Sequence, residues 1–585
     1  MLFYDFEVFK HDWLVVVIDV TNKEEHVIVN DVDKLQELYD DKKHDVWIGY
    51  NSRGYDQYIL KALLCGFDAK QVNDFIIVKG KMGWQFSSLL QKVQLNNYDI
   101  MTSFHGLKQL EGFMGNSIKE SSVPFDVDRK LTPEEIEETI KYCKHDVEQT
   151  IEVFIQRKEE FESHLSLLKA FKLPISYISK TKAQLAAIIL GANKRNHNDE
   201  FEIQFPGTLK IKKYKEVLNW YKNPLNRNYS KTLKIDVAGV PHVFAWGGLH
   251  GAIDKYSGEG HFIAIDVASY YPALMIEYDF ISRNISNPAK YREIRDTRLK
   301  LKAEKNPMQQ PYKIVLNSTY GAMKDKNNAL YDPRQANNVC VGGQLLLLDL
   351  IEMLEGHCQL IQSNTDGLII KLFKEEDYEL IDDICYEWEQ RTRMDLEFDS
   401  FKKIFQKDVN NYVIVDFDGG YKSKGGYVKK LGDLDYDLPI VNHAIKQHLL
   451  HGVHPEKTIE ECKDLREFQK IVKVSSKYMY ALYNPTITEE KIRDENNRLK
   501  TIKVFTGGEI QKEKCFRVFA SKLDSDGGIF KVKNHEKNPE KFADTPETCF
   551  IINEDVNQKT IPEKLDKTWY VNLALKRLKD FGVVI

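Results

Sequence analysis

Two aspartates one hundred residues apart, Asp266 and Asp366, each stand beside a short apolar run. Residues 262–265 precede the first and residues 368–370 follow the second, and both runs are typical of buried strands. On adjacent strand ends, the two carboxylates can share a pair of divalent ions. Such a pair suits phosphoryl transfer, in which one ion activates the attacking oxygen and the other neutralises a triphosphate.

A third run, residues 313–321, reads Lys-Ile-Val-Leu-Asn-Ser-Thr-Tyr-Gly. Its pattern predicts a helix in which Lys313, Asn317 and Tyr320 recur at i, i+4 and i+7 and therefore share one face. That face would present a cation to a triphosphate and an aromatic ring to a base.

The three runs, in this order, resemble motifs A, B and C of the family B DNA polymerases. Residues 266–272 have Tyr270 in place of the usual Leu, and residues 313–321 match without substitution. The third run departs from the pattern, because Asn364 stands where the family usually has the first acid of Asp-Thr-Asp. In the family the second acid is the essential metal ligand, so the resemblance implies that Asp366 keeps that role, while Asn364 can still hydrogen-bond but carries no charge.

The resemblance implies that Asp266, Asp366 and Lys313 are catalytic and that the two aspartates bind two Mg²⁺ or Mn²⁺ ions. Tyr271 would pack under the sugar and exclude a 2′-hydroxyl. The other nucleotide contacts that it implies are Asn317, Tyr320 and Arg295, with Arg298 as the rival of Arg295.

A second set of acids lies in the first 150 residues. Alternation in residues 3–7 predicts a strand with Asp5 and Glu7 on the same side. Asp56 follows the apolar residues 46–48, while Tyr142 and Asp146 share one face of an expected helix at 133–154. Four carboxylates and one phenol suit a second two-metal site that hydrolyses a phosphodiester.

This set resembles the DEDD-type 3′–5′ exonuclease that proofreads in the same polymerase family. Its motifs Asp-x-Glu, Asn-x-x-x-aromatic-Asp and Tyr-x-x-x-Asp match without substitution. The resemblance implies two more Mg²⁺ or Mn²⁺ ions, held by Asp5, Glu7, Asp56 and Asp146. It also implies that Tyr142 orients the attacking water and that Asn51 holds the frayed primer end. His145 is more typical of a helix surface than of a general base.

Several residues are expected to contact DNA. Residues 410–430 interleave lysines with tyrosines and predict a hairpin that turns at Asp418 and Gly419. Lys422 and Lys424 resemble the Lys-x-Lys-Gly element of the family and would follow the duplex backbone. The remaining expected contacts are Trp246, Gly247 and Gly248, in an aromatic-Gly-Gly element with Trp for the usual Tyr, and Leu107 and Lys108 near the exonuclease set.

The composition is that of a large soluble enzyme, with 585 residues of which 42% are hydrophobic. No run approaches the roughly 18 apolar residues of a membrane span, and the N-terminus does not resemble a signal peptide. The eight cysteines form no Cys-x-x-Cys pair, which argues against zinc or a disulfide framework. We therefore expect a cytoplasmic protein, in the bacterial host if phage-encoded. The net charge of −5 does not exclude DNA binding, which depends on where Lys and Arg lie.

The expected fold is α/β and α+β multidomain, with an RNase H-like exonuclease domain and a right-hand polymerase. The exonuclease would span 1–160 and a connecting segment 161–240. The palm would take 241–283 and 326–435, the fingers 284–325 and the thumb 436–585. In the last helix, 566–581, the residues available for packing are Trp569, Leu573, Leu575 and Leu578, while Lys576, Arg577 and Lys579 would face solvent or DNA.

The resulting prediction is a compact, phage-type DNA-directed DNA polymerase with proofreading. Its partners would be primer-template DNA, single-stranded DNA and deoxynucleoside triphosphates, with replisome proteins as further candidates and no membrane. Only 47 residues separate Asp266 from Lys313 and 53 separate Lys313 from Asp366. This spacing leaves little room for the insertions of protein-primed members, so we expect a nucleic-acid primer and limited unaided strand displacement. The alternatives are an exonuclease whose polymerase site is inactive through Asn364, or a non-catalytic DNA-binding replisome component.

Overall fold

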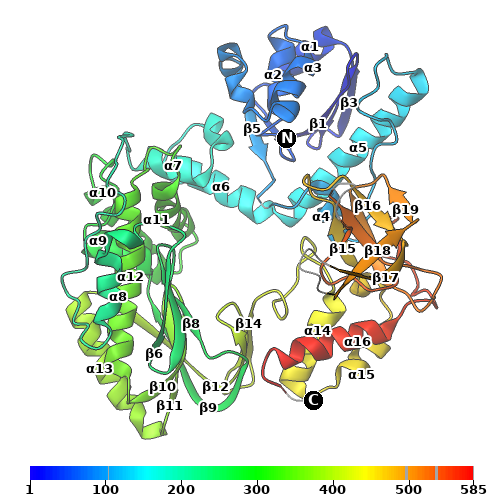
Figure 1. Ribbon diagram of the computed structural model, residues 1–585. Coiled ribbons are helices and arrows are strands. Elements are labelled where there is room, and N and C mark those ends of the chain that lie inside the picture. Colours follow the sequence, from blue (N-terminus) through cyan, green and yellow to red (C-terminus); the bar gives the residue numbers. More distant parts are fainter. Residues whose placement is uncertain (103, 494–498, 534–537, 584–585) are drawn as a thin grey trace.

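The computed structural model describes residues 1–583 apart from residue 103 and residues 494–498 and 534–537. It is a mixed α/β molecule with several bodies (Figure 1). An N-terminal domain lies at the top of the view, and a large sheet with its helices lies at the left. A C-terminal region at the right contacts the N-terminal domain through α4 (Leu107–Phe113) and the strands β15 (Lys470–Lys473) and β20 (Cys515–Ala520).

The N-terminal domain is built on a five-stranded sheet of order β3-β2-β1-β4-β5. The strands are β1 (Leu2–Val8), β2 (Trp13–Asp19), β3 (Glu24–Val29), β4 (Val46–Gly49) and β5 (Asn96–Asp99). Helices α1 (Val32–Lys42), α2 (Asp56–Leu64) and α3 (Ala69–Asn73) share a core with Tyr4 and Phe6, whereas α5 (Pro133–Gln156) shares one with Phe3. Alternation along β1 therefore turns Asp5 and Glu7 toward α5.

The central body is a nine-stranded sheet of order β14-β13-β12-β9-β11-β10-β8-β7-β6. Its strands are β6 (Thr232–Val237), β7 (Val240–Ala245), β8 (His250–Ala252), β9 (Tyr256–Val267), β10 (Cys358–Ser363), β11 (Gly367–Leu372), β12 (Leu396–Asp408), β13 (Asn411–Val415) and β14 (Tyr421–Lys424). The sheet starts at Thr232, inside the segment expected to be a connection. Ile263 and Ile265 of β9 belong to the same core as α12 (Pro333–Leu354), while Phe262 points to the opposite face.

Helix α12 is the one helix among the described residues that is long and apolar enough to cross a membrane. Its apolar window is 89% buried inside the structure, as in a core helix. Helices α9 (Tyr270–Glu277) and α13 (Tyr378–Thr392) pack on it.

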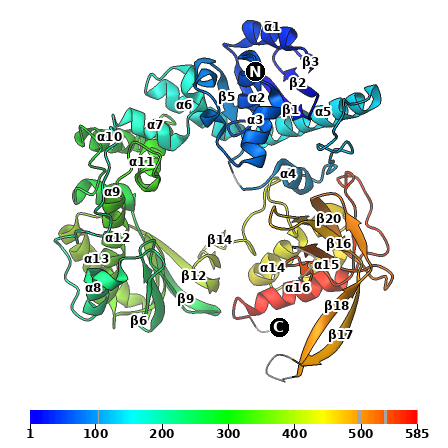
Figure 2. The ribbon, with the colours of Figure 1, turned by 45° about the horizontal axis from the view of Figure 1, so that its top comes forward.

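Two helices that pack on each other, α10 (Ala289–Ala303) and α11 (Gln309–Lys324), lie within the segment 284–325 that the sequence assigned to the fingers. Helices α6 (Lys158–Ala170) and α7 (Lys182–Ile189) pack on α11 and join it to the N-terminal domain, as Figure 2 also shows. A further helix, α8 (Lys215–Lys222), precedes β6.

The C-terminal region combines helices with two small sheets and a separate hairpin. The helices are α14 (Pro439–His451), α15 (Pro455–Glu461) and α16 (Lys567–Lys579). The sheets have orders β15-β20-β23 and β19-β16-β21-β22, with β16 (Tyr480–Tyr483), β19 (Glu509–Gln511), β21 (Ile529–Val532), β22 (Glu540–Lys541) and β23 (Cys549–Ile551). The hairpin β17 (Thr486–Arg493) and β18 (Leu499–Thr506) extends away from this region in Figure 2.

The last helix corrects one expectation. Lys576 and Lys579 are exposed, but Arg577 is buried. Its guanidinium donates to Asp544 Oδ2 at 3.0 Å and lies over the Tyr427 ring at 4.3 Å. Arg577 therefore ties the helix to its neighbours and does not face solvent or DNA.

A buried histidine makes the N-terminal domain sensitive to acid. His164 on α6 is only 4% exposed and packs edge-on against Tyr98, and burial lowers its pKa to about 4. Folding thus favours the neutral ring. The contribution of His164 to the free energy of unfolding is therefore fully present above the unfolded pKa of 6.5 and is lost as the pH falls toward 4. The loss amounts to at most about 3 kcal/mol, at 1.36 kcal/mol per pKa unit.

We expect the temperature of the first unfolding transition to fall less between pH 7 and pH 4.5 in His164→Phe than in the wild type, because the phenyl ring cannot take up a proton. Differential scanning calorimetry at stepped pH measures this. His357→Gln, at an exposed histidine, is the control and should follow the wild type. An unchanged pH slope in His164→Phe would contradict the prediction.

Candidate metal centres

The two aspartates of the central sheet come together through strand register. In the antiparallel pair β9 and β11, Asp266 lies opposite Gly367, the residue after Asp366. The Val267 N–H donates to the Asp366 carbonyl oxygen at 2.8 Å, which fixes the two strand ends side by side. The sequence thus predicted correctly that residues one hundred positions apart meet here.

Two further acids, Glu397 and Asp399 of β12, were missed from the sequence. Register places Glu397 opposite Asp266 and Asp399 opposite Ala264, on the same face of the sheet. The period-two pattern Leu-Glu-Phe-Asp at 396–399 would have put both acids on one face, but only the pairing with β9 shows which face.

These acids line a cleft of about 450 Å³ together with Tyr412, Lys422 and Lys424. The predicted hairpin is present, because β13 and β14 pair and Gly419 adopts a φ of 91° in the turn. Lys422 forms an ion pair with Asp399, and Lys424 lies over the Tyr412 ring at 5.9 Å. The lysines therefore stand at the rim of the acidic cleft.

The surroundings of Asp266 in this cleft shift its titration. Desolvation, followed by repulsion from the carboxylates of Asp366, Glu397 and Asp399, raises its pKa to about 6 against the opposing effect of Lys422. Converging carboxylates of this kind are relieved by a cation, and hard oxygen ligands suit Mg²⁺ or Mn²⁺.

A second hollow of about 350 Å³ adjoins the acidic cleft. Tyr271, Asn317, Tyr320 and Asp366 line it, so three predicted nucleotide contacts meet beside the metal ligand. The rings of Tyr271 and Tyr320 cross at 62° with centroids 4.5 Å apart. Lys313 lies on the same helix one turn before Asn317 and makes no ion pair with another described residue.

The two arginines considered as nucleotide contacts have different partners. Arg295 pairs with Glu277 at 3.3 Å and with Asp296 at 3.0 Å. Arg298 instead donates to Ser269 Oγ at 2.9 Å, and Ser269 lines both hollows. The packing of α10 thus directs Arg298 toward the two hollows.

The aromatic-Gly-Gly element also needs correction. Trp246 is only 1% exposed, packs against Phe201 and Tyr221, and donates from Nε1 to the Asn226 carbonyl oxygen at 2.8 Å. Its ring is not open to DNA and instead supports the loop. Gly247 and Gly248 follow at the surface, and a Cβ on Gly248 would lie 3.4 Å from the side chain of Thr365. The glycines thus lie close to the loop that carries Asn364.

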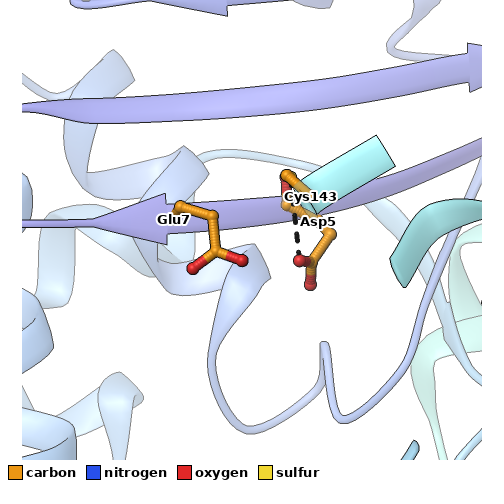
Figure 3. A group of neighbouring side chains, drawn as sticks. All are labelled: Asp5, Glu7 and Cys143. Atoms are coloured by element: carbon orange, nitrogen blue, oxygen red, sulfur yellow. Dashed lines mark hydrogen bonds between the residues drawn. The ribbon is translucent and has the colours of Figure 1, made fainter. Parts of the chain in front are cut away.

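The N-terminal acids converge from three elements. Asp5 and Glu7 project from β1 to one side, as Figure 3 shows. Asp56 opens α2 and accepts the Phe6 N–H at 3.1 Å, and Asp146 comes from α5 together with Tyr142. All four predicted carboxylates and the phenol therefore face one region of the domain.

Burial and mutual repulsion dominate these acids. Desolvation raises the pKa of Asp5 and of Glu7 well above the usual range, with neighbouring carboxylates adding to it. Desolvation also raises the pKa of Asp56 to about 7 and that of Asp146 to about 6. Such a set is stable as carboxylates only beside cations, so its donors fit two divalent ions.

Cys143 is also close to this set, with its Sγ within 4.8 Å of carboxylate oxygens of Asp5 and Glu7. Its Sγ donates to the Asp5 carbonyl oxygen at 3.3 Å and lies 3.8 Å from Asp5 Oδ2, the contact drawn in Figure 3. Burial raises the pKa of this thiol well above its ordinary value, so it remains protonated and acts as a donor.

A third group, Glu111, His145 and Lys108, borders Asp146. The Lys108 ammonium pairs with Asp146 and with Glu111 Oε1 at 3.1 Å, and it lies 4.7 Å from the centre of the Tyr142 ring. His145 Nε2 is 3.5 Å from Glu111 Oε2. The sequence named Lys108 only as a DNA contact and did not identify Glu111, because the pairing of Lys108 with Asp146, 38 residues away, cannot be deduced from spacing.

Asn51 and Leu107, the two residues expected to contact the end of a DNA strand, lie beside the N-terminal acids. Asn51 adopts a φ of 60°, and its N–H donates to Asp99 Oδ1 at 2.9 Å, which shapes the loop before Asp56. Leu107 is the first residue of α4 and is half-buried next to Lys108.

No family model matches this chain, and no curated protein matches it. Among solved structures, the family B DNA polymerase from the hyperthermophilic archaeon Pyrobaculum calidifontis is similar with a TM-score of 0.38 and 14% sequence identity. The similarity covers 100% of this chain and 78% of that one. A likeness of this size carries no functional weight, so the geometry of the residues decides the function proposed below.

Gly367 allows the close approach of the central strands. A Cβ there would stand 2.0 Å from Asp266 Oδ1 and 2.8 Å from the Ile265 carbonyl oxygen. We expect Gly367→Ala to displace Asp266, to lower stability by about 1–3 kcal/mol and to weaken Mn²⁺ binding at this sheet. Denaturant titration and Mn²⁺ titration in the Asp5→Ala background measure both effects. Gly207→Ala, where a Cβ meets nothing within 4 Å, is the control. Unchanged Mn²⁺ binding in Gly367→Ala would refute the expectation.

Proposed function

We propose that this chain is a DNA-directed DNA polymerase of family B type that extends a primer on a template and proofreads with a 3′–5′ exonuclease. The observation that carries the proposal is the presence of two separate acid sets, each gathered from distant parts of the chain. One set adjoins a hollow lined by tyrosines, which suits synthesis. The other includes Asp56, which follows the loop that carries Asn51, and suits hydrolysis of a strand end.

At the central sheet, two divalent ions held by Asp266 and Asp366 would activate a primer 3′-hydroxyl and neutralise the triphosphate. The Tyr271 and Tyr320 rings form a wall of the adjoining hollow and suit a sugar and a base. Tyr271 there excludes the larger ribose. Arg298 and Lys313 supply fixed positive charge on the side of α10 and α11.

At the N-terminal domain, two divalent ions held by Asp5, Glu7, Asp56 and Asp146 would polarise the scissile phosphate and activate water. Burial raises the pKa of Tyr142, with Asp146 raising it further, so the phenol stays protonated and can donate to the attacking water. Asn51 would hold the frayed strand end beside these acids.

A second candidate is an exonuclease whose polymerase site is inactive. It is favoured by one observation, which is that Asn364 brings no charge to the cleft. However, the Asn364 side-chain oxygen accepts the Thr365 N–H at 2.8 Å and so orders the turn before Asp366. Glu397 and Asp399 meanwhile bring two further acids to the same cleft. The cleft thus keeps enough negative charge to hold divalent ions.

Extension of a labelled primer on a DNA template with Mg²⁺ tests the proposal, with a parallel reaction without nucleotides. We expect extension in the first reaction and shortening in the second. Asp366→Ala should abolish extension and keep shortening, and Asp5→Ala should do the reverse, because the two acid sets are separate. Shortening without extension in the wild type would establish the second candidate. Neither reaction in the wild type would leave only a DNA-binding role.

Arg298 should matter more than Arg295 for nucleotide use. We expect Arg298→Ala to raise the KM for deoxynucleoside triphosphates by about tenfold, since a hydrogen bond to a charged group contributes ~1.5 kcal/mol or more. Arg295→Ala is the matched control on the same helix and should leave KM nearly unchanged. Steady-state primer extension measures both values. A larger effect for Arg295→Ala would contradict this prediction.

A further inference from the structure

Lys108 occupies a position that the exonuclease motifs do not include. It is the second residue of α4 and its side chain is only 18% exposed. Its ammonium pairs with Asp146, whose side chain is 11% exposed, and with Glu111, which is fully buried. It also lies 4.7 Å from the centre of the Tyr142 ring. One cation therefore touches a proposed metal ligand, the proposed water-orienting phenol and a second acid, Glu111.

Glu111 fixes the ammonium from the far side. It lies one helical turn after Lys108, the i+3 position at which side chains meet. Its other oxygen, Oε2, lies 3.5 Å from His145 Nε2 and accepts the Lys119 N–H at 3.4 Å. Because Glu111 is held by these neighbours, the Lys108 ammonium has a defined place and in turn restricts the rotation of Asp146.

The ion pair with Lys108 also explains why Glu111, which is not an expected metal ligand, is buried here. A buried carboxylate without a partner is costly, and removing one member of a buried ion pair destabilises the other. Glu111 is the partner of Lys108, and Lys108 offsets part of the repulsion among the N-terminal acids. The two residues form a unit that contacts Asp146 through the Lys108 ammonium.

We propose that Lys108 is a positioning residue of the N-terminal metal site, which fixes Asp146 and Tyr142 so that divalent ions and water are bound in the reactive arrangement. The effect that we expect on activity rests on the proposed exonuclease function, whereas the effect that we expect on the placement of the ions does not. Lys108 adds no ligand and repels cations, so it supports the rate and not the affinity for metal.

This role makes a distinctive prediction for Lys108→Met, which keeps the length of the side chain and removes the charge. We expect kcat for shortening of single-stranded DNA to fall by roughly 10- to 100-fold, the usual effect of losing a partner of a metal ligand. Mn²⁺ affinity, followed by electron paramagnetic resonance in the Asp366→Ala background, should stay equal or become tighter. Lys108→Arg keeps the charge and should recover most of the rate.

Two comparisons make the result specific. Asp146→Asn removes a ligand and should lower both the rate and the Mn²⁺ affinity. Lys144→Met removes a surface lysine of α5 that pairs with Glu25, and it should change neither. A full rate in Lys108→Met would overturn the proposal. A parallel loss of rate and Mn²⁺ affinity, as in Asp146→Asn, would also overturn it, because Lys108 would then only maintain the ligand set.

Failure of the proposed function can be told apart from failure of this inference. If the wild type does not shorten DNA, the exonuclease proposal fails. The role of Lys108 is then decided by Mn²⁺ positions in crystals of the wild type and of Lys108→Met. A shift of the ions or of the Asp146 side chain would support the positioning role, and identical positions would overturn it.

Discussion

Repulsion between converging carboxylates is the constraint on which both sites of this chain depend. Desolvation and neighbouring acids raise the pKa of Asp266 in one site and of Asp5 and Glu7 in the other. Lysines offset part of this repulsion, because Lys422 pairs with Asp399 and Lys302 with Glu397 in the central site, and Lys108 pairs with Asp146 in the N-terminal site. Divalent ions can balance the negative charge that remains among the acids.

The strands and helices around these acids are arranged so that the repulsion cannot separate them. β9 lies between β11 and β12, and its register with both sets the distances among the acids of the central sheet. At Gly367 the absence of a side chain lets the strands close on Asp266. In the N-terminal domain, β1 carries two acids on one face, and α2 and α5 bring the others to it. Sites on packed sheets are stiff, which suits chemistry that needs ions at fixed separation.

Local patterns were enough to predict the elements that carry the motifs. They were not enough to predict the contacts between those elements. The alternation around Asp5, the helix of Tyr142 and the hairpin beyond Tyr412 all depend on neighbours in sequence. Glu397 joined the site only through its register with β9, which no local pattern fixes. Trp246 was misjudged because the aromatic cluster that buries it comes from residues 201, 220 and 221. The different partners of Arg295 and Arg298 also depend on how α10 packs, which no local pattern fixes.

Helix α4 links the N-terminal acids to the C-terminal region. On one side it carries Lys108 and Glu111, and on the other its Phe113 carbonyl oxygen accepts Arg466 Nη2 at 2.7 Å. Arg517, fully buried, donates to the carbonyl oxygens of Gly112 at 3.2 Å and Asn116 at 2.7 Å. A buried guanidinium needs all its donors satisfied, and Arg517 achieves this only while both regions are docked. The C-terminal region therefore helps to fix the helix that places an ammonium on Asp146.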